Sequence, residues 1–219
     1  MDALINLLPE LLDATFETLY IVALCMLFGG LGGLIVGLGL YVTRAGGLLP
    51  NRVVNTVLNV LVNTFRPIPF IIFLAAVQPL ARAVVGTGIG DPAIIFSIAL
   101  AAVFGISRIV EQNLLTVQPG VIEAARSVGA GPWRIIRTLL LPEALGPLIL
   151  GYAFVFVAIV DMTAVAGFIG GGGLGNFAIL YGYRQFEPVV TWAAVIVIIL
   201  IVQLVQFFAN WLARRVLRR

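Results

Sequence analysis

Residues 18–43, with the sequence TLYIVALCMLFGGLGGLIVGLGLYVT, carry no charged side chain and decide the fold class. A membrane-spanning helix needs about 20 mostly apolar residues, because roughly 30 Å of hydrocarbon is crossed at a rise of 1.5 Å per residue. Residues 92–107 and 188–213 are also uncharged, and residues 144–183 hold only one charge, on Asp161. These stretches predict a protein built from membrane-spanning helices.

The overall composition agrees with this prediction. Of the 219 residues, 61% are apolar and 11% are charged, whereas a soluble domain has about 25% charged and 45–50% apolar residues. This composition excludes a soluble globular enzyme and a disordered chain. We expect an all-α, polytopic membrane protein that forms a single transmembrane domain over residues 1–219. The expected five spans lie near residues 17–41, 64–82, 93–115, 143–166 and 189–212.

Three residue types that are absent or rare restrict the chemistry of the chain. There is no histidine, so histidine ligands and histidine acid–base catalysis are excluded. Cys25 is the only cysteine, so neither an intrachain disulfide nor a cysteine metal cluster can form. All 13 basic residues are arginine, and a Walker A loop requires a lysine that reaches the phosphates. We therefore expect no catalytic residue, no metal and no cofactor bound by this chain, and any ATP-driven step would need ATP on a partner subunit.

The distribution of arginine predicts the orientation in the membrane, because loops on the cytoplasmic side carry an excess of basic residues. With five spans, one side holds nine arginines and the other side holds only Arg82 and Arg184, with Arg66 and Arg108 near span ends. The nine are Arg44, Arg52, Arg126, Arg134, Arg137, Arg214, Arg215, Arg218 and Arg219. The N-terminus is then predicted outside and the C-terminus in the cytoplasm.

Residues 119–142, with the sequence PGVIEAARSVGAGPWRIIRTLLLP, form the predicted cytoplasmic segment between the third and fourth spans. Pro119 is suited to a first helical position, and Gly129 to the left-handed residue after a helix. Pro132 is expected to begin a second helix and Pro142 to stop it. Such a helix–turn–helix could dock into a groove of a partner or lie on lipid headgroups. The spacing alone does not decide between these two alternatives.

The same segment resembles the EAA signature of importer-type ABC transporter permeases. The positions that match this signature are Glu123, Ala124, Ala125, Gly129, Leu139, Leu141 and Pro142. Other stretches resemble the permeases of methionine importers, so the resemblance covers nearly the whole chain. These stretches are YVTRAG at 41–46, FRPIPF at 65–70, the glycine run at 170–175 and Tyr181-Gly182-Tyr183.

The resemblance implies a type I ABC importer permease fold in a bacterial inner membrane. It implies a homodimeric pore, held by a dimer of ATP-binding subunits and supplied by an extracytoplasmic substrate-binding protein. Residues 123–129 would be the coupling helix that is seated in the ATPase, and D- or L-methionine would cross by alternating access. No nucleic-acid partner is expected, and membrane lipid surrounds the chain.

Asp161 is the main candidate for the translocation pathway. An ionisable side chain within a span is costly and is a functional candidate by default, and a carboxylate could attract the ammonium group of an amino acid. Met162 could add a soft apolar contact, and Arg66 lies beside Pro67 and Pro69, which break the second span. Alternatively, Asp161 is wetted by solvent or paired with an arginine, and the break is purely structural.

The cargo and the transport class also have alternatives. Family members commonly have Gly-Tyr-Ser-Ala-Met where this chain has residues 161–165, DMTAV. A polar amino acid or a short peptide is therefore an alternative cargo. A standalone ion-coupled carrier is the alternative from another class, although the chain has few intramembrane acids for a proton relay.

Two periodic stripes indicate helix packing. Gly29, Gly33 and Gly37 are spaced by four residues and allow close approach of another helix, within one subunit or between two. Four asparagines at positions 51, 55, 59 and 63 form a stripe that either packs inward or faces the membrane interface.

Two further local patterns have structural interpretations. Arg108 and Glu111 are one turn apart and are expected to pair with each other or with headgroups. The glycine run at 170–175 formally matches a dinucleotide fingerprint, but no strand is predicted before it. A tight turn or a re-entrant loop is the better interpretation of this run.

Overall fold

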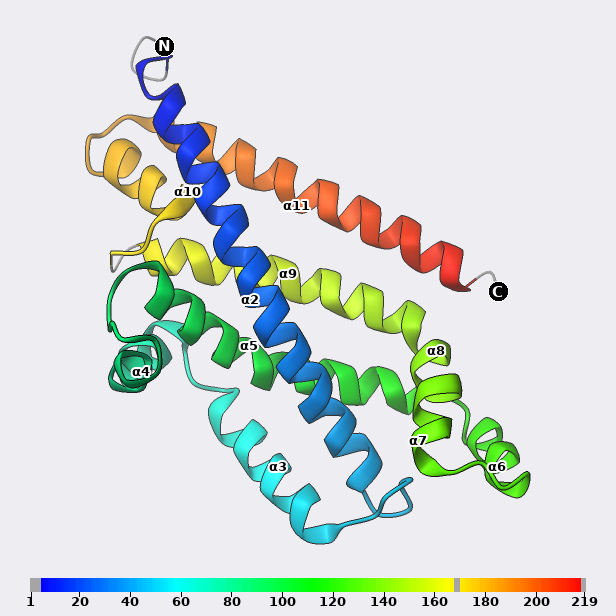
Figure 1. Cartoon of the computed structure of the whole chain (residues 1–219). Coiled ribbons are helices and arrows are strands. Elements are labelled where there is room, and N and C mark those ends of the chain that lie inside the picture. The colour runs from blue at the N-terminus through cyan, green and yellow to red at the C-terminus, as the bar shows by residue number, and fades with distance from the viewer. Residues whose placement is uncertain (1–4, 168–169, 218–219) are drawn as a thin grey trace. The chain divides into compact units, whose positions relative to one another are not determined.

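The computed structural model describes residues 5–167 and 170–217, and every regular element in these residues is a helix (Figure 1). The all-α prediction is therefore confirmed for the described residues. The long helices are α2 (Leu8–Thr43), α5 (Gly90–Leu115), α9 (Leu145–Gly167) and α11 (Pro188–Leu217). The shorter elements are α3 (Arg52–Phe65), α4 (Phe70–Val85), α6 (Pro119–Ser127), α7 (Pro132–Ile135), η1 (Ile136–Leu140), α8 (Leu141–Glu143), α10 (Gly173–Phe177) and η2 (Ala178–Tyr183).

Four of these helices are long and apolar enough to cross a membrane, and the number rises to five if the bent pair α3 and α4 counts as one span. The expected span at 64–82 includes the break between these two helices, which covers residues 66–69. Pro67 and Pro69 cause the break, because proline has no N–H group to donate and clashes with the preceding turn. Helix α4 consequently begins at Phe70 and has only 16 residues.

The chain divides into two compact units. One consists of Met1–Gly29, Ile68–Ala102 and Phe156–Gln206, and the other of Gly30–Pro67, Val103–Val155 and Phe207–Arg219. We call them the first and the second unit. The helices α2, α5, α9 and α11 each contribute residues to both.

The core of the first unit contains side chains from both ends of the sequence. Leu11 and Ala14 of α2 are buried together with Leu174 and Phe177 of α10. Val190 and Ala194 of α11 complete this cluster. The short helix α10 is thereby packed between two long helices.

The glycine stripe of α2 packs against α5 within the chain. In the second unit, a Cβ atom on Gly33 would lie 2.5 Å from Ile106 Cβ, and one on Gly37 would lie 2.5 Å from the carbonyl oxygen of Ser107. In the first unit, a Cβ atom on Gly29 would lie 2.8 Å from Ala102 Cβ. Of the two alternatives from the sequence, the stripe therefore serves packing within one subunit.

The asparagine stripe of α3 faces inward in the second unit. Asn51 caps the helix by accepting a hydrogen bond from the Val54 N–H at 3.1 Å. Asn55 Nδ2 donates to the Leu40 carbonyl at 3.0 Å, and Asn59 Nδ2 donates to Asn55 Oδ1 at 3.0 Å. The opposite face of α3 is exposed at Val53, Val57 and Val60.

Arg108 of α5 completes this polar network. Its Nη2 donates to Asn59 Oδ1 at 2.7 Å and to Asn63 Oδ1 at 2.8 Å, and its Nη1 forms an ion pair with Glu111. The expected pairing of Arg108 with Glu111 is confirmed. A guanidinium in a membrane helix thus receives a carboxylate and two amide oxygens as partners, which offset the cost of removing it from water.

The contact between α2 and α5 predicts opposite effects for two glycine-to-alanine changes. Gly37→Ala places a methyl group 2.5 Å from the Ser107 oxygen and 2.6 Å from Val110 Cβ, so we expect a loss of about 1–3 kcal/mol of stability. Gly105→Ala meets no atom within 4 Å and should be neutral or stabilising by up to about 1 kcal/mol. The midpoint temperature of unfolding in detergent measures both. Equal midpoints for the two variants would contradict the close approach of α2 and α5.

Candidate functional site

The segment at 119–143 begins with a short helix whose two ends are fixed. Pro119 occupies the first turn of α6, as its position in the sequence predicts. After α6, Gly129 has a φ angle of +80°, and the Ala130 N–H donates to the Ala125 carbonyl at 3.1 Å. This is the hydrogen bond of a left-handed helix termination, which satisfies a free carbonyl at the helix end.

The second half of the segment differs from the prediction that Pro142 stops the helix. Helix α7 begins at Pro132, as expected, but the chain continues through the π-helical turn η1 and through Pro142 to Glu143. Pro142 lies in the first turn of α8, after a widened turn, where the missing N–H is tolerated. The direction changes only at Ala144, whose ψ angle is −3°.

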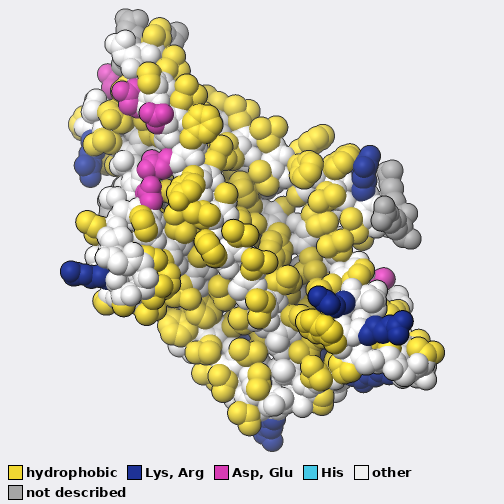
Figure 2. Space-filling model, in the orientation of Figure 1, with side chains coloured by type: hydrophobic (Ala, Val, Ile, Leu, Met, Phe, Trp, Pro, Cys, Tyr) yellow, Lys and Arg dark blue, Asp and Glu magenta, His cyan; other side chains and the backbone are white. Residues whose placement is uncertain are grey.

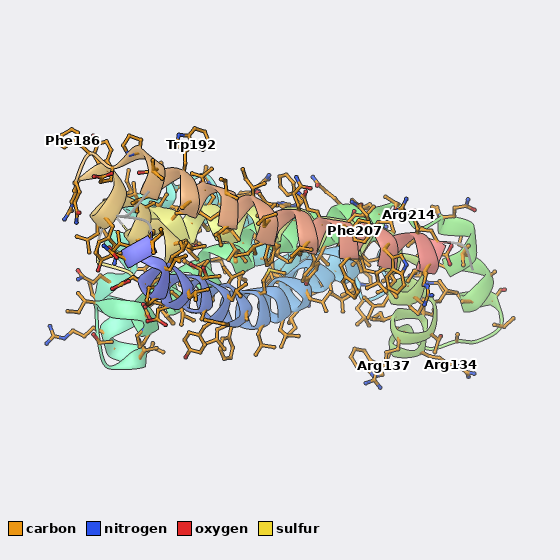
Figure 3. All side chains as sticks on the ribbon, turned by 90° about the horizontal axis from the view of Figure 1, so that it is seen from above. Arg134, Arg137, Phe186, Trp192, Phe207 and Arg214 are labelled. Atoms are coloured by element: carbon orange, nitrogen blue, oxygen red, sulfur yellow. The ribbon has the colours of Figure 1, made fainter. Side chains whose placement is uncertain are left out.

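The segment has a buried side and an exposed side. Ile135, Ile136 and Leu140 form its buried side within the second unit. Figure 3 shows Arg134 and Arg137 extending away from the ribbon, and both are exposed. Among the EAA positions, Glu123, Ala124, Gly129 and Pro142 are exposed, whereas Ala125, Leu139 and Leu141 are half-buried. The exposed face is available to a partner.

A single side chain links α6 to the end of α2. Arg126 Nη2 donates to the carbonyl oxygen of Gly47 at 2.7 Å, across 79 positions in the sequence. Gly47 lies in the turn that follows α2, and Tyr41, Arg44, Ile122 and Glu123 line a cleft of about 270 Å³ beside this turn. The amino-acid pattern predicted the helix but not this link, because nothing in residues 44–51 identifies Gly47 as an acceptor.

The candidate pathway residues are accessible. Asp161 of α9 is exposed, and its carboxylate forms no hydrogen bond or ion pair with any described residue. Met162 is half-buried, and Thr163 beside it is buried and donates to the Val160 carbonyl at 2.7 Å. Arg66 is exposed in the break between α3 and α4. The alternative in which Asp161 is paired with an arginine is not found among the described residues.

Two cavities of the first unit lie at the end of α4. One of about 520 Å³ includes Arg82, and another of about 220 Å³ includes the buried Ser97; both are lined by Gln78, Gly88 and Ile89. Neither is lined by Asp161 or Met162. The structure therefore does not bring the candidate pathway residues into these cavities.

The glycine run forms a tight turn that is held by α2. We call residues 170–175 the glycine loop. Gly170 and Gly173 have φ angles of +90° and +83°, respectively. Glu17 Oε2 accepts a hydrogen bond from the Gly173 N–H at 2.6 Å, and Thr18 Oγ1 accepts one from the Leu174 N–H at 2.8 Å. A Cβ atom on Gly172 would collide with the Glu17 carboxylate. The tight turn expected from the sequence is confirmed, whereas its attachment to α2 was not predicted.

The charged side chains of the described residues are unevenly distributed. Figure 2 shows acidic side chains gathered over the N-terminal turns of α2 and arginine side chains over α6 to η1. Among the described residues, no three His, Cys, Asp or Glu side chains are placed to hold a metal ion. The described residues therefore form apolar helices together with one short, exposed helix whose ends are fixed, α6.

Comparison with known proteins gives consistent results. The chain is 39% identical over 206 residues to the probable D-methionine transport system permease protein MetI of Vibrio cholerae, covering 94% of this chain and 92% of that protein. It is 38% identical over 203 residues to the methionine import system permease protein MetP of Bacillus subtilis, covering 93% and 91% of the two chains.

A solved structure is similar over almost the full length. It is the MetNI methionine ABC transporter in inward-facing conformations, with a TM-score of 0.93 and 37% identity over 96% of this chain and 98% of that chain. The family model of the binding-protein-dependent transport system inner membrane component matches residues 29–218. The chain therefore belongs to the family of inner membrane components of binding-protein-dependent transport systems, the permeases of ABC importers.

Proposed function

We propose that this chain is the membrane-spanning subunit of an ATP-driven importer of D- or L-methionine. The observation that carries the proposal is the exposed helix α6, which has fixed ends and holds Glu123, Ala124 and Ala125 of the EAA signature. The names of the relatives MetI and MetP support methionine as the cargo. A homodimer of this chain would form the pore, with an ATPase dimer on one side and a substrate-binding protein on the other.

The EAA residues would transmit the motion of the ATPase subunits. A short helix with fixed ends transmits a displacement better than a flexible loop does. Ala124 is small enough to allow close approach of the partner, and the exposed Glu123 can meet a basic group. Leu139, Leu141 and Pro142 would support the segment from its second half. Closure of the ATPase dimer would then rock the two permease subunits and open the pore alternately to each side.

The energy source would lie outside this chain. ATP would bind to the partner ATPase, because the sequence contains no lysine for a Walker A loop. We propose no cofactor, metal or catalytic residue on the permease itself. We propose that α6 and the C-terminus face the cytoplasm and the N-terminus the outside, which the arginine distribution favours.

The cargo would pass the exposed carboxylate of Asp161. A carboxylate without a protein partner is available to the ammonium group of an amino acid. Met162 beside it could contact an apolar side chain, and Arg66 could meet a carboxylate at the break of the second span. A polar amino acid is the second candidate cargo, because this chain has DMTAV at 161–165.

Changes in the coupling helix should separate ATP hydrolysis from transport. Gly129 has a φ angle of +80°. An alanine in this left-handed conformation, as in Gly129→Ala, costs about 1–2 kcal/mol of conformational energy, because its Cβ atom lies too close to the following carbonyl oxygen. Glu123→Ala removes the exposed carboxylate. We expect each variant to lower methionine uptake about ten-fold while the protein stays in the membrane. Uptake and ATP hydrolysis are measured in vesicles that contain the ATPase and the binding protein.

Gly131→Ala is the matched control for this experiment. Gly131 has a φ angle of −68°, and a Cβ atom on it would meet no atom within 4 Å. We expect its uptake to equal that of the wild-type protein. Unchanged uptake in both Glu123→Ala and Gly129→Ala would refute the coupling assignment. Uptake that persists after ATP depletion but is lost with an uncoupler would favour an ion-coupled carrier.

Removal of the Asp161 charge should weaken recognition of the cargo. We expect Asp161→Asn to raise the KM for methionine uptake about ten-fold, because a charge-assisted hydrogen bond is replaced by a neutral one. Glu187→Gln removes an exposed acid of the same unit and should leave KM unchanged. Competition by polar amino acids in the same assay tests the second cargo. An unchanged KM in Asp161→Asn would remove this residue from the pathway.

A further inference from the structure

Helix α2 is attached to the coupling helix at its C-terminal end. The turn after α2 is stiff, because the Leu49 N–H donates to the Val42 carbonyl at 2.9 Å and the Asn51 N–H donates to the Thr43 carbonyl at 3.0 Å. Gly47 within this turn is buried, and a Cβ atom on it would collide with the Val42 carbonyl. A displacement of Arg126 therefore reaches the last turn of α2 without a flexible linker between them.

Helix α2 is also attached near its N-terminal end, to the glycine loop. The Glu17 carboxylate and the Thr18 hydroxyl accept hydrogen bonds from the first two N–H groups of α10. Thr18 is buried, and its own hydroxyl donates to the Ala14 carbonyl at 2.9 Å. A shift of α2 along its axis would therefore displace the start of α10, or break these bonds.

The helix between these two attachments is continuous. It extends over 36 residues from Leu8 to Thr43, and its only proline is Pro9, in the first turn (Figure 1). Helices bend sharply at proline or at inserted residues, and residues 10–43 contain no proline. The glycines that could weaken it are packed against neighbouring helices, namely Gly29, Gly32, Gly33 and Gly37 against α5, Gly30 against α9 and Gly39 against α3.

We infer that α2 connects the coupling helix to the glycine loop mechanically, with Arg126 and Glu17 as the positioning residues at its two ends. The inference rests on the proposed function for the role of α6 as the coupling helix. Motion imposed on α6 by the ATPase passes through Arg126 and Gly47 to α2, and from α2 through Glu17 and Thr18 to α10. The two hydrogen-bonded contacts act in series.

A double-mutant cycle tests the series arrangement. Arg126→Ala and Glu17→Ala each remove one contact, and Arg52→Ala and Glu10→Ala remove exposed charges outside the coupling segment as controls. The readout is the amount of methionine transported per ATP hydrolysed, in vesicles with the ATPase and the binding protein. We expect each single variant to lower this ratio about five-fold and the controls to leave it unchanged.

The double variant distinguishes the mechanisms. If the two contacts act in series, loss of either one already interrupts the transmission of motion. The transport-to-hydrolysis ratio of the double variant should therefore fall no further than that of the more affected single variant. Losses that multiply, to about 25-fold, would mean independent contacts and would overturn the inference. The conservative variants Arg126→Lys and Glu17→Gln keep a donor and an acceptor and should recover much of the ratio. Failure of both to recover it would indicate a purely structural role and would also overturn the inference.

A second measurement is independent of the cargo. The turn η2 directly follows α10, and Tyr183 at its end is exposed. The native cysteine, Cys25, is buried and therefore protected from the label. We expect ATP with orthovanadate to change the maleimide labelling rate of Tyr183→Cys at least about two-fold, and this change to be absent when Arg126→Ala is added. An ATP-dependent change that survives Arg126→Ala, or that is absent from Tyr183→Cys alone, overturns the inference. If the protein transports no methionine but this labelling behaves as expected, the proposed cargo fails and the link stands.

Discussion

The fold depends on the rule that a backbone N–H or C=O group in hydrocarbon has no water to bind. Helices satisfy these groups internally, and every regular element of the described residues is a helix. Lipid also removes the hydrophobic force between helices, so close packing must hold them together. The glycines of α2 supply this packing, because their missing Cβ atoms let α5 approach within van der Waals contact.

The same rule explains what happens where helices end. A helix end leaves unpaired backbone groups, and side chains from distant parts of the sequence bind several of them. Glu17 and Thr18 bind the start of α10 in this way, whereas Asn51 is a local cap at the start of α3. The polar residues of this apolar chain are therefore few, but many of them fix the position of one element against another.

The helical fold and the short helix α6 could be predicted from the sequence because both are encoded locally. Uncharged stretches identify the four long helices, and Pro119 with Gly129 fixes the ends of α6. The Arg126–Gly47 and Glu17–Gly173 contacts could not be predicted, since each joins residues that are 79 or 156 positions apart. The prediction that Pro142 stops a helix was wrong, because its effect depends on the widened turn η1 before it.

In the second span, the two prolines of the break and the charge of Arg108 together determine where the polar side chains lie. Pro67 and Pro69 remove helix donors there, so α3 can turn its amide face toward Arg108 while its valine face stays exposed. An unbroken helix through residues 52–85 would carry these asparagines and Arg66 into one apolar span, where each polar group is costly. The break instead keeps these asparagines in α3 and Arg66 in the turn, and the apolar residues of α4 remain available to the membrane.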